Sequence, residues 1–115
     1  MGDLSPHFSR WEFDCPHCGY LGDVSRELLG VMEELRRQLG RQLVVVSGVR
    51  CPEYNARVGG IRTSQHLQGR AADVPRGLFR ARDARAAGAH GAGVRAGWVI
   101  HVDVTPGRSF FTFDE

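Results

Sequence analysis

The sequence predicts an α+β fold in which a small antiparallel β-sheet is flanked by helices. Leucine and methionine recur at three-and-four spacing over residues 26–39, as on one face of a helix. Residues 42–47 contain three consecutive valines, and residues 98–104 alternate polar and apolar side chains toward their end, as strands do. An amphipathic helix and short strands together in one small chain are typical of the α+β class.

Length and composition predict one domain over residues 1–115. A chain of this length has room for one hydrophobic core. Hydrophobic residues make up 42% of the chain, and no apolar run approaches the roughly 20 residues that span a bilayer. The formal net charge is +2, and the cationic residues are scattered along the sequence. We therefore expect neither a membrane nor a nucleic acid as a partner.

The three cysteines admit two interpretations. Their odd number excludes a complete internal disulfide framework. Cys15-Pro-His-Cys18 has the spacing of a zinc knuckle, and Cys51 with His17 or His7 would complete a structural zinc site. Because one Cys-x-x-Cys without a second pair is a weak signal, we favour reduced, partly buried cysteines over this second zinc.

The N-terminal half is expected to contain one long helix and one buried strand. Ser25 is placed to cap a helix over residues 26–39, and Gly40 to end it. The valine run predicts a buried strand over residues 42–47. Ahead of the helix, a helical turn is expected to pack four large apolar side chains on the core: Leu4, Phe8, Trp11 and Phe13.

The C-terminal half is expected to add two helices and two strands. Proline in its first turn favours a helix over residues 52–58, and alanine content favours another over residues 78–87. Residues 70–74 are expected to form a strand, and four glycines to make residues 88–97 a loose segment. The last strand, residues 98–104, would close the sheet.

Polar side chains share one face of each of the last two predicted strands. Alternation puts His101 and Asp103 on one face of the final strand together with Val99. The opposite face would carry four apolar side chains: Trp98, Ile100, Val102 and Val104. Ala71 and Asp73 share a face in the same way. A carboxylate buried without a partner costs several kcal/mol, so we expect each aspartate to meet a cation, a metal or strong donors.

Three side chains can complete an open zinc site. His66 lies in a predicted loop, and Asp73 and His101 lie on the predicted strands. Three nitrogen or oxygen ligands leave a fourth position for water, as in catalytic zinc sites, whereas structural zinc is usually closed by four ligands that are mostly thiolates. The pattern therefore favours a zinc hydrolase.

One motif carries a family resemblance, together with a dyad further along the chain: Ser64-x-His66-x-x-Gly69-x-Ala71-x-Asp73, then His101-Val-Asp103. It resembles the zinc D-Ala-D-Ala carboxypeptidase and peptidoglycan endopeptidase family, including its small phage and prophage members. Ser47-Gly48-Val49-Arg50 matches the element that supplies the family's substrate-contacting arginine. The resemblance spans roughly residues 4–105 and implies a Hedgehog/DD-peptidase-like fold.

The resemblance also implies the site. Zinc would be bound by His66, Asp73 and His101, and water on the metal would be the nucleophile. Arg50 would be catalytic and substrate-binding, holding a peptide carbonyl or carboxylate, because its planar fork suits a developing oxyanion. Ser64 would support the substrate or the metal loop by hydrogen bonding.

The general base is where the chain departs from the family pattern. Some branches place an acid three residues before the second zinc histidine, where this chain has Trp98; others place a histidine two residues before it, where this chain has Val99. Asp103 is then the candidate base, or else it orients His101 from behind the metal. His90 is the second candidate.

We therefore expect a zinc-dependent metallopeptidase that cleaves peptidoglycan stem peptides, as a D-Ala-D-Ala carboxypeptidase or an endolysin-type endopeptidase. The chain lacks the basic and apolar regions of a signal peptide, so it would stay in the cytoplasm until released, or travel with a phage. Its partner would be the peptidoglycan peptide, and it would act as a monomer. The alternatives are a non-catalytic, zinc-containing module that binds peptidoglycan or a protein, favoured by Trp98, and a structural zinc protein organised on the cysteines.

Overall fold

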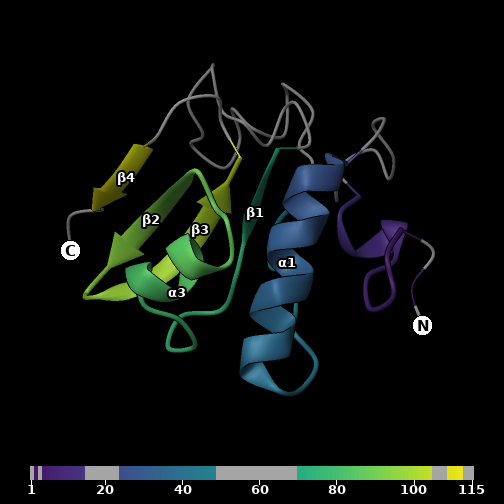
Figure 1. The fold of residues 1–115 in the computed structure, drawn as a ribbon, viewed down its shortest axis with the longest axis horizontal. Helices are drawn as coiled ribbons and strands as arrows, with labels where there is room; N and C mark the ends of the chain where they lie inside the picture. Colours follow the sequence, from purple (N-terminus) through teal and green to yellow (C-terminus); the bar gives the residue numbers. More distant parts are fainter. Residues whose placement is uncertain (1, 3, 15–23, 49–69, 105–108, 113–115) are drawn as a thin grey trace.

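The fold combines short helices with one four-stranded sheet (Figure 1). A computed structural model describes residues 2, 4–14, 24–48, 70–104 and 109–112. The elements are η1 (Arg10–Glu12), α1 (Arg26–Leu39), β1 (Ala71–Asp73), α3 (Ala81–Ala86), β2 (Gly91–Arg95), β3 (Trp98–Asp103) and β4 (Ser109–Thr112). The α+β class is confirmed. The helix predicted over residues 52–58 lies outside the described residues.

The sheet has the strand order β1-β3-β2-β4. Strand β3 runs antiparallel to both β1 and β2, whereas β4 pairs with β2 in parallel. The prediction of an antiparallel sheet is therefore right for three strands and wrong for β4. Because β3 is an inner strand, side chains on each of its faces have neighbours on both sides.

Helix α1 begins and ends where its local sequence signals predict. The Ser25 hydroxyl accepts a hydrogen bond from the Leu28 N–H at 3.3 Å, and Gly40 ends the helix with a left-handed φ of 77°. Its buried stripe consists of Leu28, Leu29, Val31, Met32 and Leu35. Within the described part of the chain, no helix is long and apolar enough to cross a membrane.

Both helices lie on the same side of the sheet. Helix α3 packs on β2 and β3, and α1 lies beside α3 (Figure 1). The core between the layers joins the stripe of α1 to four buried side chains of the sheet: Ala72, Ala92, Val99 and Val102. One face of the sheet is thus apolar and covered by helices, which leaves the other face to its polar side chains.

Helix α3 is shorter than the helix predicted over residues 78–87. The Phe79 carbonyl accepts a hydrogen bond from the Val99 N–H at 2.9 Å, so the chain is still extended beside β3 at this point. Arg80 keeps an extended conformation and donates its N–H to Asp83 Oδ2 at 2.8 Å. Tertiary pairing therefore delays the start of the helix until Ala81.

Strand β2 occupies the segment that its glycines predicted to be loose. It forms a hairpin with β3, and the two linking residues, Ala96 and Gly97, both have positive φ, at 52° and 82°. A two-residue link of this kind matches the right-handed twist of antiparallel strands. The prediction for residues 88–97 is therefore wrong, because cross-strand pairing outweighs the low strand propensity of glycine.

A β-bulge changes the side-chain alternation within β3. Gly93 pairs with His101, but Val94 pairs with Val99, so Ile100 is an extra residue on β3. Val99 is consequently buried in the core with Val102 and not beside His101 as predicted. The shared face of His101 and Asp103, which follow the bulge, is retained.

Residues 42–47 do not form the predicted strand. Only Ser47 bridges to β1, opposite Asp73, with hydrogen bonds from Val46 N–H to Asp73 O (2.9 Å) and from Asp73 N–H to Ser47 O (2.8 Å). Leu43 is buried, but Val44 and Val46 are 54% and 60% exposed. The valine run indicated extended backbone correctly, but Val45 is the only one of the three valines that packs against the core, whereas a strand buried on both faces would bury all of them.

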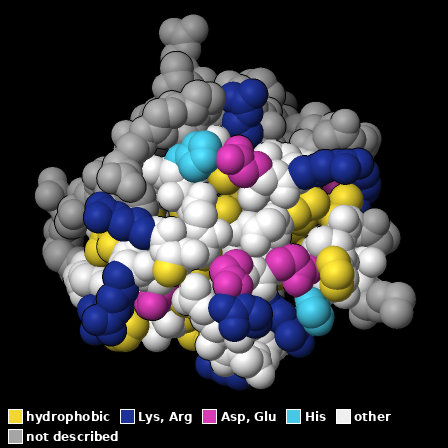
Figure 2. Space-filling view, viewed as in Figure 1, with side chains coloured by type: hydrophobic (Ala, Val, Ile, Leu, Met, Phe, Trp, Pro, Cys, Tyr) yellow, Lys and Arg dark blue, Asp and Glu magenta, His cyan; other side chains and the backbone are white. Residues whose placement is uncertain are grey.

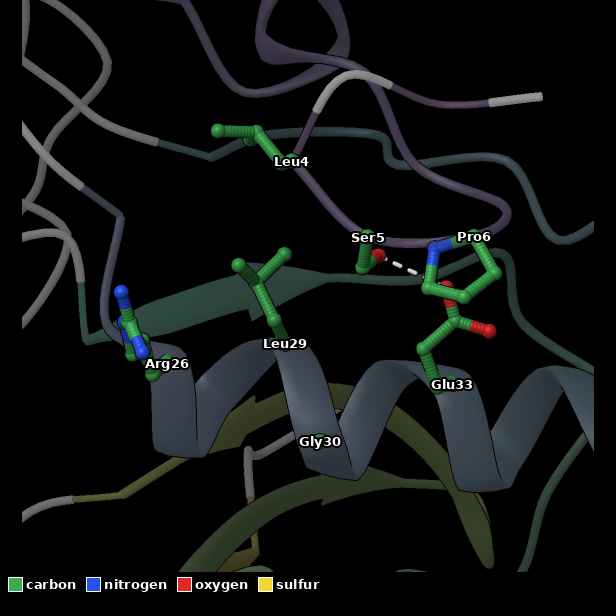
Figure 3. Close-up of a pocket in the computed structure, with 7 residues that line it drawn as sticks. All are labelled: Leu4, Ser5, Pro6, Arg26, Leu29, Gly30 and Glu33. Carbon is green, nitrogen blue, oxygen red and sulfur yellow. Dashed lines mark hydrogen bonds between the residues drawn. The ribbon is translucent and has the colours of Figure 1, made fainter.

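The N-terminal segment packs against the core and α1. Phe8 and Phe13 are buried and meet edge to face at 6.0 Å, and η1 supplies the predicted helical turn. Trp11 is 74% exposed, so its predicted packing is wrong. Glu33 of α1 accepts a hydrogen bond from the Ser5 hydroxyl at 2.6 Å (Figure 3) and another from the His7 N–H at 2.8 Å, and these bonds hold this segment on the helix.

A groove lies between this N-terminal segment and α1. Figure 3 shows Arg26 toward one end of it, Leu4 and Leu29 in the middle, and Glu33 toward the other end. Among the described residues, those that line this groove belong to the N-terminal segment and α1, and none belongs to the sheet. It is therefore separate from the polar face of β1 and β3 considered next.

Candidate metal site on the sheet

Adjacent strands bring two of the three predicted zinc ligands together. Asp73 of β1 pairs directly with His101 of β3, and Ala71 pairs with Asp103. Directly paired residues project from the same face of a sheet, so all four share one face. Ala72 and Val102, which pair between them, point instead into the core. The predicted placement of Asp73 and His101 on neighbouring strands is therefore what the structure has.

The imidazole of His101 lies between two carboxylates. Its Nδ1 is 3.0 Å from Asp73 Oδ1 on the neighbouring strand, and its Nε2 is 3.0 Å from Asp103 Oδ2 two residues along the same strand. The side chains of His101, Asp73 and Asp103 are 14%, 24% and 5% exposed. This polar row is thus largely withdrawn from solvent, as the sequence argument for partnered aspartates requires.

The surroundings set the charge of His101. Burial lowers its pKa, but the hydrogen bonds to Asp103 and Asp73 and the charges of both carboxylates outweigh burial and raise the pKa to about 9. Without a metal, the ring is therefore a cation at neutral pH and both nitrogens donate. A metal ion that binds this ring must displace a proton, as is general for histidine ligands.

Strand β2 adds no side chains to this face where the polar row lies. Gly93 is opposite His101, and Gly91 is opposite Asp103. Glycine inside a strand often marks a close approach of another group to the backbone. Their alternate spacing matches that of His101 and Asp103, a signal of a strand that our prediction of a loose segment over residues 88–97 missed.

Backbone hydrogen bonds hold both carboxylates in place. Asp73 pairs with β3 on one side and with Val46 and Ser47 on the other. The carbonyl of Asp103 accepts a hydrogen bond from the His90 N–H at 3.0 Å. Sites carried by paired strands are more rigid than sites on loops, so the separations within the polar row are fixed by the sheet.

The pair formed by His101 Nδ1 and Asp73 Oδ1 fits adjacent ligands of one zinc ion. Zinc–nitrogen and zinc–oxygen distances near 2.1 Å place two tetrahedral ligand atoms about 3.4 Å apart. The observed separation of 3.0 Å needs only a small adjustment. Asp103 lies at the other ring nitrogen, so it faces away from that position.

The complete predicted zinc site is not formed by the described residues alone. Among them, no three histidine, cysteine, aspartate or glutamate side chains gather so as to hold a metal ion. The reason is that Asp73 and Asp103 contact opposite nitrogens of the His101 ring, so the two carboxylates do not face one common position. His66, the predicted third ligand, lies outside the described residues, as do Arg50 and Ser64. The three cysteines proposed for a second zinc, Cys15, Cys18 and Cys51, also lie outside them.

His90, the second candidate for the general base, and Trp98, which stands where some family branches have an acid, have other contacts. His90 Nε2 lies 2.9 Å from Glu27 Oε2 of α1, on the helix-covered side of the sheet. Trp98 lies on the opposite side from Val99, and the guanidinium carbon of Arg80 is 3.6 Å from the centroid of its ring. The position that other branches of the resembled family fill with an acid thus holds an indole covered by a cation.

The helix-covered face carries charges of both signs. Figure 2 shows arginine side chains at separate places on this face, among acidic and uncharged side chains. They do not merge into one basic patch in this view. The arrangement in space therefore follows the scattered distribution along the sequence.

Comparison with known proteins identifies the family. No curated protein gives a significant match to the chain. The family model described as peptidase M15 matches residues 6–103, which is most of the chain and includes Asp73, His101 and Asp103. The match and the ligand-like pair on β1 and β3 agree with the motif from which a peptidase was predicted. The chain therefore belongs to the peptidase M15 family.

Proposed function

We propose that the protein is a zinc-dependent peptidase that hydrolyses the stem peptides of peptidoglycan. The observation that carries the proposal is the pair of Asp73 and His101, 3.0 Å apart on adjacent strands, in a chain of a peptidase family. Either a D-Ala-D-Ala carboxypeptidase or an endolysin-type endopeptidase is compatible with such a site. The substrate is taken from the family that the motif resembles.

His66, Asp73 and His101 are the residues that would hold the zinc. Bound zinc supplies Lewis-acid chemistry, because it polarises a carbonyl group and acidifies water. Asp73 and His101 contribute fixed positions, since their strands are paired. Neutral His101 is required for binding, so its ring must lose one proton to solvent when the metal enters.

Arg50 and Ser64 are proposed to act on the substrate. The planar guanidinium of Arg50 would donate to a peptide carboxylate or to the oxygen that gains charge during hydrolysis. The Ser64 hydroxyl would hydrogen-bond the substrate or the loop of His66. Both roles are taken from the motif. Substitution of either residue should cause a loss of turnover while the zinc content of the protein stays unchanged.

The first test measures zinc content and turnover in the same preparation. The wild-type protein should bind one zinc per chain and release D-Ala or new amino groups from purified peptidoglycan. Asp73→Ala should lose the zinc and the turnover, because it removes one ligand. Glu27→Gln is the matched control: it removes a carboxylate that also faces a histidine, but on the helix side. Full zinc content in Asp73→Ala would contradict the proposed site.

A second candidate is a zinc-containing module that binds peptidoglycan or a protein without cleaving it. Trp98 favours it, because an indole covered by Arg80 stands where several family branches have an acid. Stoichiometric zinc and retention on insoluble peptidoglycan, without turnover of any stem peptide, would support this module over the peptidase.

A further inference from the structure

Asp103 is the most buried carboxylate of the polar row. The residue is 4% exposed, and its Oδ2 lies 3.0 Å from His101 Nε2. The opposite ring nitrogen, Nδ1, lies 3.0 Å from Asp73 Oδ1. Because the two nitrogens of an imidazole point in diverging directions, a group held between Nδ1 and Asp73 is out of reach of Asp103.

We propose that Asp103 is a positioning residue that acts through His101. Its carboxylate accepts a hydrogen bond from Nε2, so that the proton displaced when a metal binds is the one on Nδ1, the nitrogen that faces Asp73. A carboxylate or carbonyl on the second nitrogen commonly orients histidine ligands of metals in this way. The inference rests on the proposed function, and it assigns Asp103 this role in place of general base.

The geometry of β3 enforces this contact. Residues two apart on a strand share a face, so Asp103 lies along the strand from the ring while Asp73 lies across from it. The register neighbours of Asp103 are Ala71 and Gly91, and neither has a side chain that donates a hydrogen bond. Among the neighbouring positions on β1, β2 and β3, the imidazole of His101 is thus a donor to this carboxylate.

A general base would need a different position. It has to reach a water molecule beside the metal within about 3 Å or through one further water. Asp103 is on the far edge of the ring from Asp73, so the imidazole itself stands between the carboxylate and that position. The residue is also only 4% exposed, whereas a general base needs access to that water.

The test uses the full chain with histidine labelled by nitrogen-15 and loaded with zinc. In the wild-type protein, His101 should be coordinated through Nδ1 and should keep a slowly exchanging proton on Nε2. Asp103→Ala should make that proton exchange rapidly and weaken zinc binding about 10–100-fold, measured by competition with a chelator. Asp103→Asn should lie between the two, because its amide oxygen still accepts a hydrogen bond. Glu27→Gln should match the wild type.

The outcomes separate the inference from the function on which it rests. Coordination through Nε2, or unchanged zinc affinity in Asp103→Ala, would overturn the positioning role while leaving zinc binding intact. Loss of turnover in Asp103→Asn, with zinc affinity and the Nε2 proton unchanged, would also overturn it and indicate a base. If zinc leaves the His101 signals of the wild type unaltered, both proposals fail. Should Asp103→Ala not fold, the Asn variant decides.

Discussion

At the scale of single residues, His101 joins two carboxylates that were predictable to different degrees. Its shared face with Asp103 follows from alternation along one strand, so the sequence was sufficient to predict it. Its contact with Asp73 also depends on the register between β1 and β3. Alternation of side chains restricts the possible registers but does not select one of them. The family motif supplied what local patterning could not.

Val99 shows where residue-level prediction failed. Strict alternation placed it beside His101, but the extra residue at Ile100 turns it into the core. A bulge depends on how two strands pair, and nothing in residues 98–104 alone marks its position. Side-chain faces were therefore predictable after the bulge and not before it.

The contact between Arg80 and Trp98 can be tested at the same scale. Arg80→Met keeps an apolar stem but removes the cation over the indole and the hydrogen bond from Nη1 to the Gly97 carbonyl, at 3.0 Å. We expect the free energy of unfolding in urea to fall by about 1 kcal/mol. Arg82→Met, on the exposed surface of α3, is the control and should change it by less than about 0.5 kcal/mol. Equal effects would show that the stacked contact contributes nothing.

At the scale of elements, α1 was predictable because its signals are local. Its cap, its apolar stripe and its terminal glycine lie within sixteen consecutive residues, from Ser25 to Gly40. Strand β2 was not predictable from local signals, because its glycines favour coil and their backbone becomes extended only through pairing with β3. The prediction for residues 42–47 failed in the opposite direction. Strand propensity is high in this segment, but it pairs with β1 at one position.

Two glycines of α1 should respond to alanine in opposite directions. Gly30 is exposed within the helix, and a Cβ added there meets nothing within 4 Å, so Gly30→Ala should stabilise the protein by about 0.5–1 kcal/mol. Gly40 has a φ of 77°, which strains an alanine, so Gly40→Ala should destabilise it by about 1 kcal/mol. Urea unfolding of both variants tests the pair. A gain at Gly40 would mean that the helix ends differently.

The attachment of the N-terminal segment to α1 should depend on pH. Burial raises the pKa of Glu33, but hydrogen bonds from Ser5 and His7 prevail and hold it below the ordinary value of 4.5. A lowered pKa stabilises the folded state above the unfolded value, and this stabilisation is lost as pH falls through the folded value. Glu33→Gln should therefore lower stability more at pH 7 than at pH 3, in urea unfolding. A difference that is the same at both values would contradict the ion-pair and hydrogen-bond contribution.

At the scale of the whole molecule, the helices α1 and α3 lie on one face of the sheet, and the polar side chains of β1 and β3 lie on the other face. Segregation of apolar and polar side chains in β1 and β3 was enough to predict that division. The parallel pairing of β4 was not predictable, because it depends on how the chain returns after β3. Buried core side chains lie on β1, β2 and β3, and they constrain how these three strands pair.

Zinc should stabilise the whole fold, because two of its proposed ligands, Asp73 and His101, lie on separate strands. A ligand that binds only the folded state at 100 times its Kd adds about 2.7 kcal/mol to the free energy of unfolding. Thermal unfolding of the metal-free protein should therefore shift upward on adding zinc and return with a chelator. Asp73→Ala should show no such shift. An identical melting temperature with and without zinc in the wild type would count against the proposed site.

The bulge at Ile100 has one more consequence. In an uninterrupted strand, side chains three positions apart project from opposite faces, so a side chain at position 98 would not share the face of His101. Because the bulge adds one residue, the side chains at positions 98 and 101 project from the same face of the sheet. Val99, between them, is buried on the other face. The backbone of this protein would therefore place an acid at position 98 on the same face as the His101 imidazole. At this position the chain differs from the other family branches in its side chain and not in its backbone.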